Sequence, residues 1–491
     1  MSYILQNTRG KIVSGLAFLI LISCSQPKSR VNFTELEKQV NKGEFEITRQ
    51  VIDSLKQQKK ITPTEFRKLD SLQDVMYRIS LDFSLKEKQI KEQLDNYFGE
   101  LDDSLLQRWE QTGKLEMRRI DGKKRYFSNA APNLFRLDSS AAVQKLKVDG
   151  KHVNSLDLFC LDHTTKVIRK SKNSFDPVLP VNMVLTYTIR VKPNVVPAGD
   201  MIRCWMPVPR EGNPRQRKFK LLSSEPDSVI IAPNDYLQRT AFLTKPAIAN
   251  EPTVFQLQFS IETSAQYFNL KPENVKSYDT SSEFYRHHTA ERPPHLVFTP
   301  DITNLAKRIV GSETNPLRKV EKIYTWINDS IPWASALEYS IMPNIPEYVL
   351  ACRHGDCGMH TLLFMSLARS QGIPVKWQSG FMLHPVHVNL HDWCEVYYEG
   401  IGWVPLDQSF KLQDSPDKQL REFYVHGIDS YRLIVNDDYG QELYPPKKYL
   451  RSEPYDFQRG EVEWDGGNLY FDQWNWHMEV DYQEEKSKIK K

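Results

Sequence analysis

The spacing of apolar residues changes along this 491-residue chain, and each spacing permits a different secondary structure. Between residues 31 and 168 apolar residues recur every three to four positions, as in the run from Phe66 to Ile79, which predicts amphipathic helices. One of these helices is expected to begin at Thr62-Pro63-Thr64-Glu65, which has the pattern of a capping box with proline in the first turn. The sequence therefore predicts a helical N-terminal region over 31–168.

After residue 180 the apolar residues recur at every second position instead. Apolar and polar residues alternate from Val181 to Val191 and again from Phe255 to Ile261, with Pro-rich turns between them. This alternation is typical of strands with one buried face. We predict an antiparallel β-sandwich over 180–265, then a mixed core over 295–412 and a small β-rich tail over 413–491. The fold class is therefore α+β.

The numbers of basic and acidic residues indicate whether the chain is suited to bind nucleic acid. Lys and Arg number 65 against 62 Asp and Glu, so the formal net charge is only +3. Nucleic-acid binding normally requires a clear basic excess. Nucleic acid is therefore not expected as a partner.

The first 30 residues have the pattern of an export signal. Arg9 and Lys11 precede a short apolar run that ends at Ser23-Cys24, which predicts a signal peptide over 1–23. The tetrad Leu21-Ile22-Ser23-Cys24 resembles a bacterial lipobox, so we predict lipidation of Cys24 and a tether over 24–30. The expected location is the bacterial cell envelope, at the outer membrane or the periplasmic face, with the membrane bound through the lipid. The alternative is an ordinary signal peptide in which the cysteine is coincidental.

Five cysteines remain when Cys24 is set aside, and one of them has the setting of a nucleophile. Their number is odd and their spacing irregular, so they do not form a disulfide framework. Asp356 is predicted to cap a helix that runs to Gly372, which places Cys357 in the first turn. A helix N-terminus favours the thiolate, so we expect a lowered pKa for Cys357. The structural alternative is a buried, unreactive thiol.

A predicted hairpin downstream carries a histidine and a carboxylate. His391 begins its first strand, Glu399-Gly400-Ile401-Gly402 forms the turn, and Asp407 ends its second strand. The two side chains can therefore approach each other. A carboxylate beside an imidazole holds its tautomer and stabilises the imidazolium in Cys-His-Asp hydrolases.

These motifs resemble the transglutaminase-like superfamily of papain-fold enzymes. The matching text is Gly355-Asp356-Cys357-Gly358, Gly372-Ile373-Pro374, His391-Asp392-Trp393 and Gly402-Trp403-Val404-Pro405-Leu406-Asp407, within roughly a quarter of the chain. The resemblance implies a papain-like core with Cys357 as nucleophile, His391 as general base and acid, and Asp407 as the residue that orients the histidine. The text from Gly427 to Leu433 also resembles a subfamily of bacterial lipoproteins.

The second donor of an oxyanion hole is less defined by the sequence. The backbone N–H of Cys357 is the natural first donor, and Trp333, Tyr339 and Gln378 are candidates for the second, with Trp333 preferred. A metal site formed by His384, His387, His391 and Cys394 is an alternative, but their positions lack a known zinc spacing. No metal and no cofactor are predicted.

The expected chemistry is cleavage of an amide through a thioester at Cys357. The substrate class is a peptide, a protein or a glycopeptide. Hydrolysis is preferred over amine transfer, because a thioester that is not shielded from water is hydrolysed and no segment has the pattern of a calcium loop. The alternatives are a cross-linking transglutaminase, with a tunnel walled by Trp333, Trp377 and Trp403, and an inactive binding scaffold of the same fold.

Overall fold

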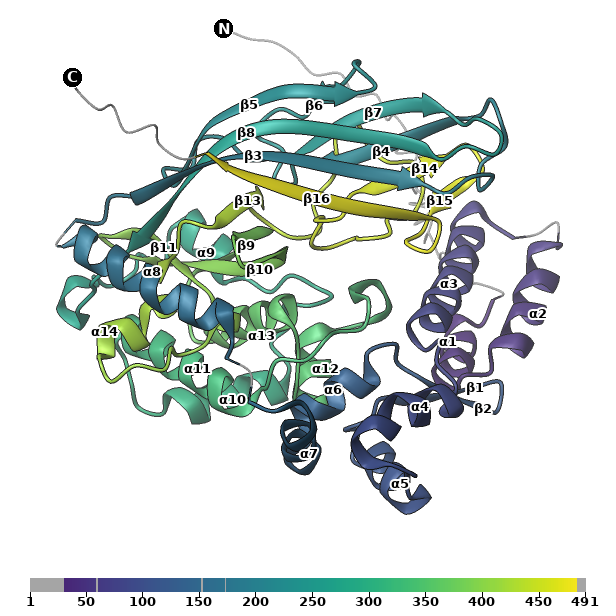
Figure 1. Cartoon of the computed structure of the whole chain (residues 1–491), viewed down its shortest axis with the longest axis horizontal. Coiled ribbons are helices and arrows are strands. Elements are labelled where there is room, and N and C mark those ends of the chain that lie inside the picture. The colour runs from purple at the N-terminus through teal and green to yellow at the C-terminus, as the bar shows by residue number, and fades with distance from the viewer. Residues whose placement is uncertain (1–30, 59–60, 152, 173, 484–491) are drawn as a thin grey trace, which may run out of the picture.

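The computed structural model describes residues 31–58, 61–151, 153–172 and 174–483. The predicted signal peptide, Cys24 and the tether over 24–30 lie outside these residues. Within the described part of the chain, no helix is long and apolar enough to cross a bilayer. Figure 1 shows the first helices of the chain, drawn in purple, at one end of the molecule and a β-sandwich lying over a mixed helix and sheet core. This arrangement confirms the predicted α+β class.

The described residues of the N-terminal region form eight helices and one hairpin. The helices are α1 (Phe33–Lys42), α2 (Phe45–Lys56), α3 (Pro63–Asp82), α4 (Glu87–Phe98), α5 (Asp103–Gln111), α6 (Ala130–Leu137), α7 (Ser139–Asp149) and α8 (Ser155–Ser171). Helix α3 begins at the capping box: Thr62 Oγ1 accepts the Glu65 N–H at 3.2 Å, and the Glu65 carboxylate accepts the Thr62 N–H at 3.0 Å.

Strands β1 (Met117–Ile120) and β2 (Lys123–Tyr126) form a hairpin that the helical spacing did not predict. Their side chains are mostly charged, so they lack the alternation of a half-buried strand. The turn at Asp121-Gly122, where both residues have positive φ, was the available signal.

The sandwich has two five-stranded sheets. It contains β3 (Val178–Val191), β4 (Met201–Pro207), β5 (Gln216–Glu225), β6 (Ile230–Ile231), β7 (Thr240–Pro246), β8 (Thr253–Tyr267), β12 (Gly427–Ile428), β14 (Glu461–Trp464), β15 (Gly467–Leu469) and β16 (Trp474–Gln483). One sheet has the order β12-β8-β3-β16, with β5 also on β8, and the other has the order β15-β14-β4-β7-β6.

The predicted tail over 413–491 is not a separate unit. Strand β16 pairs along ten residues with β3, β14 pairs with β4, and β12 pairs with β8. The tail therefore completes the sandwich predicted over 180–265. Its remaining strand, β13 (Arg432–Asn436), joins the sheet of the core instead. Such long-range pairing has no local pattern by which it can be predicted.

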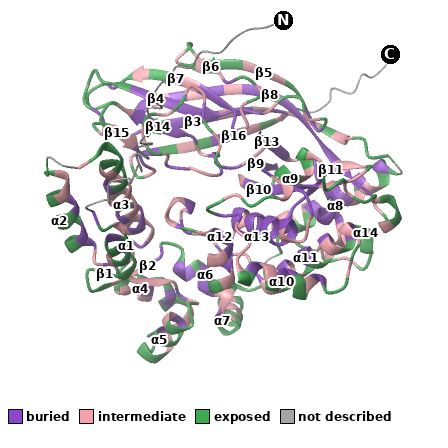
Figure 2. Ribbon diagram, turned by 180° about the vertical axis from the view of Figure 1, so that it is seen from behind, coloured by how far each residue is buried: buried purple, intermediate pink, exposed green. Residues whose placement is uncertain are grey.

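The core consists of a four-stranded sheet and the helices packed on it. Its strands are β9 (Val375–His384), β10 (His387–Tyr398), β11 (Gly402–Leu406) and β13, and they pair in the order β11-β10-β9-β13. Its helices are α9 (Glu283–Thr289), α10 (Pro300–Val310), α11 (Pro316–Ser330), α12 (Ile345–Cys352), α13 (Cys357–Ser370) and α14 (Lys418–Arg421). Four short 3-10 turns connect these elements: η1 (Pro272–Asn274), η2 (Tyr339–Ile341), η3 (Gln408–Phe410) and η4 (Phe423–Val425). Every residue of α13 from Gly358 to Arg369 is buried, as Figure 2 shows by its colour.

Strand β9 is buried on both faces. Trp377 belongs to the apolar core shared with the helices, whereas Phe381 and Leu383 belong to the apolar core of the sandwich. This four-stranded sheet is therefore held between α13 and the sandwich, which fixes the positions of the residues on β10.

Candidate active site

Cys357 is the first residue of α13, and three side chains surround it. Asp356 caps the helix, because its Oδ1 accepts the Met359 N–H at 3.1 Å. Tyr339 donates its hydroxyl to the same oxygen at 2.5 Å. A Cβ on Gly358 would lie 2.2 Å from the Tyr339 hydroxyl and 2.8 Å from Asp392 Oδ2. Glycine is therefore required at this position for the three side chains to meet.

The thiol does not have the expected low pKa. Burial raises the pKa of Cys357 well above its usual range, and the carboxyl groups of Asp392 and Asp356 raise it further. The thiol donates a hydrogen bond to Asp392 Oδ2 at 3.3 Å. The prediction of a lowered pKa was wrong, because loss of hydration and two nearby carboxyl groups outweigh the partial positive charge of the helix N-terminus.

His391 and Asp407 meet as their positions on the hairpin predicted. Nε2 of His391 on β10 lies 2.8 Å from Oδ2 of Asp407, which follows β11. Asp407 Oδ1 accepts the Ser409 N–H at 3.1 Å, and the Tyr324 hydroxyl donates to the Asp407 carbonyl at 2.8 Å. Because Nε2 is engaged, Nδ1 is the ring nitrogen left for the thiol or a substrate.

Arg432 on β13 is a second partner of Asp407 that our sequence reasoning missed. Its guanidinium lies 3.1 Å from Asp407 Oδ2 and 3.0 Å from Asp429 Oδ2, and its side chain is completely buried. Burial alone would raise the pKa of Asp407, but His391 and Arg432 together lower it below its usual range. The available signal was a single arginine before the apolar run Leu433-Ile434-Val435.

Gly380 permits β13 to approach. It pairs with His391 across β9 and β10, and a Cβ on it would lie 2.1 Å from the Leu433 carbonyl oxygen. A larger residue would push β13 away from β9, and with it Arg432.

The histidines and cysteines near the site lie in separate environments. Cys160, His384 and Asp429 are buried, and their donor atoms lie within 4.8 Å of one another, as a metal site would require. However, Arg432 lies 3.1 Å from His384 Nε2 and also binds Asp429, so it already supplies a positive charge there. Cys394 donates instead to the Leu406 carbonyl at 3.7 Å.

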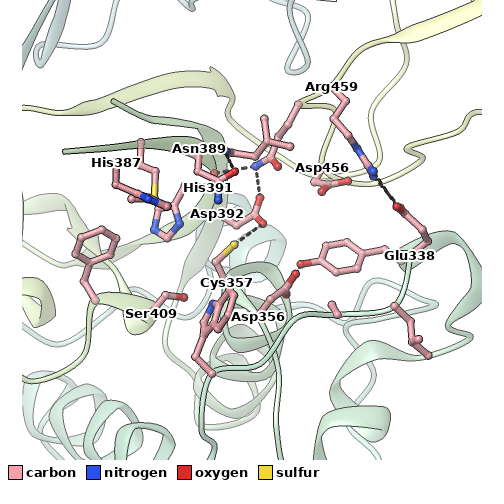
Figure 3. A pocket seen from close by; sticks show the side chains of 18 of the residues that line it. Glu338, Asp356, Cys357, His387, Asn389, His391, Asp392, Ser409, Asp456 and Arg459 are labelled. Carbon is pink, nitrogen blue, oxygen red and sulfur yellow. Dashed lines mark hydrogen bonds and ion pairs between the residues drawn. The ribbon is translucent and has the colours of Figure 1, made fainter. Parts of the chain in front are cut away.

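Cys357 and His391 line one cavity of about 950 Å³. Three regions of the chain contribute to it: Arg136 from the helical region, Trp333 with Cys357 and His391 from the core, and Asp456 and Arg459 from the C-terminal segment. Figure 3 shows the Cys357 sulfur, the His391 ring and the carboxyl groups of Asp392 and Asp456 facing this space.

The three candidates for the second oxyanion donor lie in different surroundings. Trp333 lines the cavity, beneath the Arg136 guanidinium at 4.8 Å, and its neighbour Ala334 donates its N–H to the Gly355 carbonyl at 3.0 Å. The Tyr339 hydroxyl is engaged with Asp356. Gln378 is buried away from the cavity, where its amide binds Trp393 and Asp437.

Residues 303–408 match the family described as the transglutaminase-like superfamily. This match confirms the predicted resemblance and the transglutaminase-like core of the fold. A protein of Haemophilus influenzae, described only as uncharacterized, is 24% identical over 284 residues, which are 48% of this chain and 72% of that protein.

Two solved structures are also similar. A candidate cysteine protease from Cytophaga hutchinsonii aligns with 14% identity and a TM-score of 0.43, over 62% of this chain and 92% of that chain. The periplasmic domain of TgpA from Pseudomonas aeruginosa aligns with 13% identity and a TM-score of 0.25, over 52% of this chain and 94% of that chain.

Proposed function

Residues 303–408 form a transglutaminase-like domain, and we propose that it makes this protein a cysteine hydrolase that cleaves an amide bond through a thioester. The observation that carries this proposal is the 2.8 Å contact of His391 with the buried Asp407, because His391 lines the same cavity that exposes Cys357 to a substrate. A nucleophile, a base and a group that orients the base are the parts that acyl transfer needs.

In the first step the Cys357 sulfur attacks the amide carbonyl. Because burial keeps this thiol protonated, its proton passes to His391 Nδ1 as the S–C bond forms. Asp407 stabilises the resulting imidazolium, which then gives the proton to the leaving amine as the C–N bond breaks. The product is an acyl thioester on Cys357 and a free amine.

In the second step water resolves the thioester. His391 takes a proton from the water, the hydroxyl attacks the carbonyl, and the C–S bond breaks to release a carboxylic acid while Cys357 regains its proton. During both steps the carbonyl oxygen carries negative charge. The Cys357 N–H and the Trp333 indole N–H are the donors we assign to it.

Hydrolysis is favoured over amine transfer by the lining of the cavity. Transfer requires an apolar tunnel that protects the thioester from water. Trp377 is buried in the core, and Trp403 packs against Phe284 and Tyr397. Neither lines the cavity at Cys357, so the aromatic tunnel considered from the sequence lacks two of its three walls.

We further propose that the protein is a lipoprotein of the bacterial cell envelope. The text around Cys24 supports lipidation, so the membrane is the first partner, at the outer membrane or on the periplasmic face. The second partner is the substrate, a peptide, a protein or a glycopeptide. The near-neutral charge of the chain does not favour nucleic acid.

The test uses peptide and cell-wall libraries with and without a fluorescent amine, read by mass spectrometry. We expect the wild type to release amines and carboxylic acids, and Cys357→Ala to release neither. Dominant incorporation of the fluorescent amine would support the cross-linking alternative. Equal turnover by Cys357→Ala would overturn the mechanism, and an absence of turnover with an unreactive Cys357 would favour the inactive scaffold.

A further inference from the structure

One wall of the cavity is acidic, and one of its carboxyl groups has no partner on another residue that the structure describes. Asp456 is 8% exposed, and its carboxyl group accepts no hydrogen bond and forms no ion pair with another residue that the structure describes. It faces the cavity near Asp392 and Cys357 (Figure 3). Its own backbone N–H donates to it, but a buried carboxylate with no other donor is unfavourable unless a ligand supplies one.

The nearby arginine is already engaged by two other acids. Arg459 binds both oxygens of Glu338 at 2.8 and 2.7 Å, and its Nε binds Glu453 at 2.8 Å. These contacts use one N–H of each guanidinium nitrogen, and Arg459 makes no hydrogen bond or ion pair with Asp456. Asp456 therefore remains open to a cation that enters from the cavity.

The position of Asp392 restricts where such a cation sits. Its Oδ2 lies 3.3 Å from the Cys357 sulfur, and an attacked carbonyl carbon approaches that sulfur to about 3 Å. In an amino acid the α-nitrogen is about 2.5 Å from its own carbonyl carbon. An α-ammonium group on the attacked residue can therefore come within hydrogen-bond reach of Asp392.

We propose that Asp392 and Asp456 bind the free α-ammonium group of the residue whose carbonyl Cys357 attacks. This inference rests on the proposed function and narrows it: the substrate is a peptide with a free N-terminus, and the product is its first residue. Burial and the Asp456 charge raise the pKa of Asp392 well above its usual range, and burial and the Glu453 charge do the same for the pKa of Asp456. A bound ammonium group would offset the unfavourable negative charge of these two carboxyl groups.

The test measures alkylation of Cys357 in the full chain by three chloromethyl ketones, using intact-protein mass spectrometry. The reagents are alanyl chloromethyl ketone, its desamino analogue and its N-acetyl derivative. In each case the sulfur displaces chloride and the thiol proton goes to solvent. We expect the free-amine reagent to react at least tenfold faster than the other two. The ratio of rates within one variant cancels any change in the reactivity of the thiol itself.

Asp456→Asn should reduce this ratio to near one. Asp157→Asn is the matched control, because Asp157 is an exposed acid of the same cavity, and its ratio should stay at the wild-type value. Equal wild-type rates for the free-amine and desamino reagents would overturn the inference while leaving the nucleophile intact. Equally fast reaction of Nα-acetyl-lysyl chloromethyl ketone would also overturn it, since the cation would then be a side chain. Failure of all reagents, iodoacetamide included, would remove the proposed function itself.

Discussion

The thiol of Cys357 donates its hydrogen bond to Asp392 Oδ2, 3.3 Å away, rather than to His391. Two residues next to each other on β10 therefore face the nucleophile with different roles. Asp392 holds the thiol proton at rest, and His391, which Asp407 orients from the other side, is the base for attack. A substrate that engages Asp392 would release the thiol to His391, which couples binding to activation.

The first prediction concerns this contact. Because burial and Asp392 raise the pKa of Cys357, its alkylation by iodoacetamide should rise with pH without a plateau near neutrality. Asp392→Asn removes a negative charge beside the thiol and so lowers the pKa of Cys357. Labelling of Cys357 at pH 8 should therefore be about tenfold faster, which is the effect of one pKa unit. Asp157→Asn should leave the rate unchanged. A wild-type plateau below pH 8 would contradict this.

The second prediction concerns Arg432. Arg432→Met leaves Asp407 and Asp429 without their buried partner, so the free energy of unfolding should fall by about 3–5 kcal/mol. The pKa values of both acids are lowered in the fold. The stability that these two ionised carboxylates give to the fold is therefore present above the usual carboxyl pKa of 3.8. It is lost as the pH falls through their lowered pKa values in the folded protein.

The destabilisation by Arg432→Met should accordingly shrink below pH 4, as measured by urea unfolding from pH 3 to 7. Arg318→Met is the control, since Arg318 pairs with Glu321 at a half-exposed site, and it should cost less than about 1 kcal/mol. Similar losses for both variants would contradict the proposed importance of burial.

The third prediction concerns Asp82, where α3 meets the core. Asp82 Oδ2 accepts the Glu338 N–H at 2.8 Å, and burial together with the Glu338 charge raises the pKa of Asp82 to about 7. Stability from this group is fully present below pH 3.8 and is lost as pH rises through 7.

Asp82→Asn keeps the acceptor and removes the charge, so it should raise the free energy of unfolding at pH 8 by roughly 2–4 kcal/mol and flatten the profile between pH 5 and 8. The exposed Asp95→Asn should change neither quantity. Equal urea midpoints for Asp82→Asn and wild type at pH 8 would argue against a buried charge at this contact.

The fourth prediction concerns the catalytic set. Cys357→Ala and His391→Ala should each abolish turnover of the peptide substrate without lowering the melting temperature greatly. Asp407→Asn should retain a residual rate, reduced by about 10⁴, because it disturbs the tautomer and orientation of the histidine but leaves the base in place. Full activity of any of the three would exclude its assigned role.

The fifth prediction concerns the anchor. The mature chain should begin at Cys24, carry acyl mass on that residue and partition into detergent. Cys24→Ser should be either unprocessed or released in soluble form. An unmodified N-terminus at another residue, found by mass spectrometry, would remove the lipoprotein proposal and leave the enzyme proposal unchanged.

The amino-acid sequence alone determined the features that depend on neighbours in the chain. The capping box at Thr62, the helix start at Cys357 and the hairpin between His391 and Asp407 all follow from residues within a few positions of one another. Local backbone preferences and side-chain periodicity are sufficient for these features. The match to a known family likewise rests on one continuous segment, residues 303–408, which contains the helix start at Cys357 and the hairpin.

Only the tertiary structure decided what surrounds the thiol. Arg432 reaches Asp407 because β13 pairs with β9, and Asp456 reaches the cavity from a loop nearly one hundred residues after Cys357. Neither contact has a local pattern. The pKa of Cys357 shows the same division: its place at a helix N-terminus predicts a lowered pKa, but the burial and the carboxyl groups that raise it come from distant segments. Hydration and charge act through space, so the sequence could locate the nucleophile but could not predict its protonation.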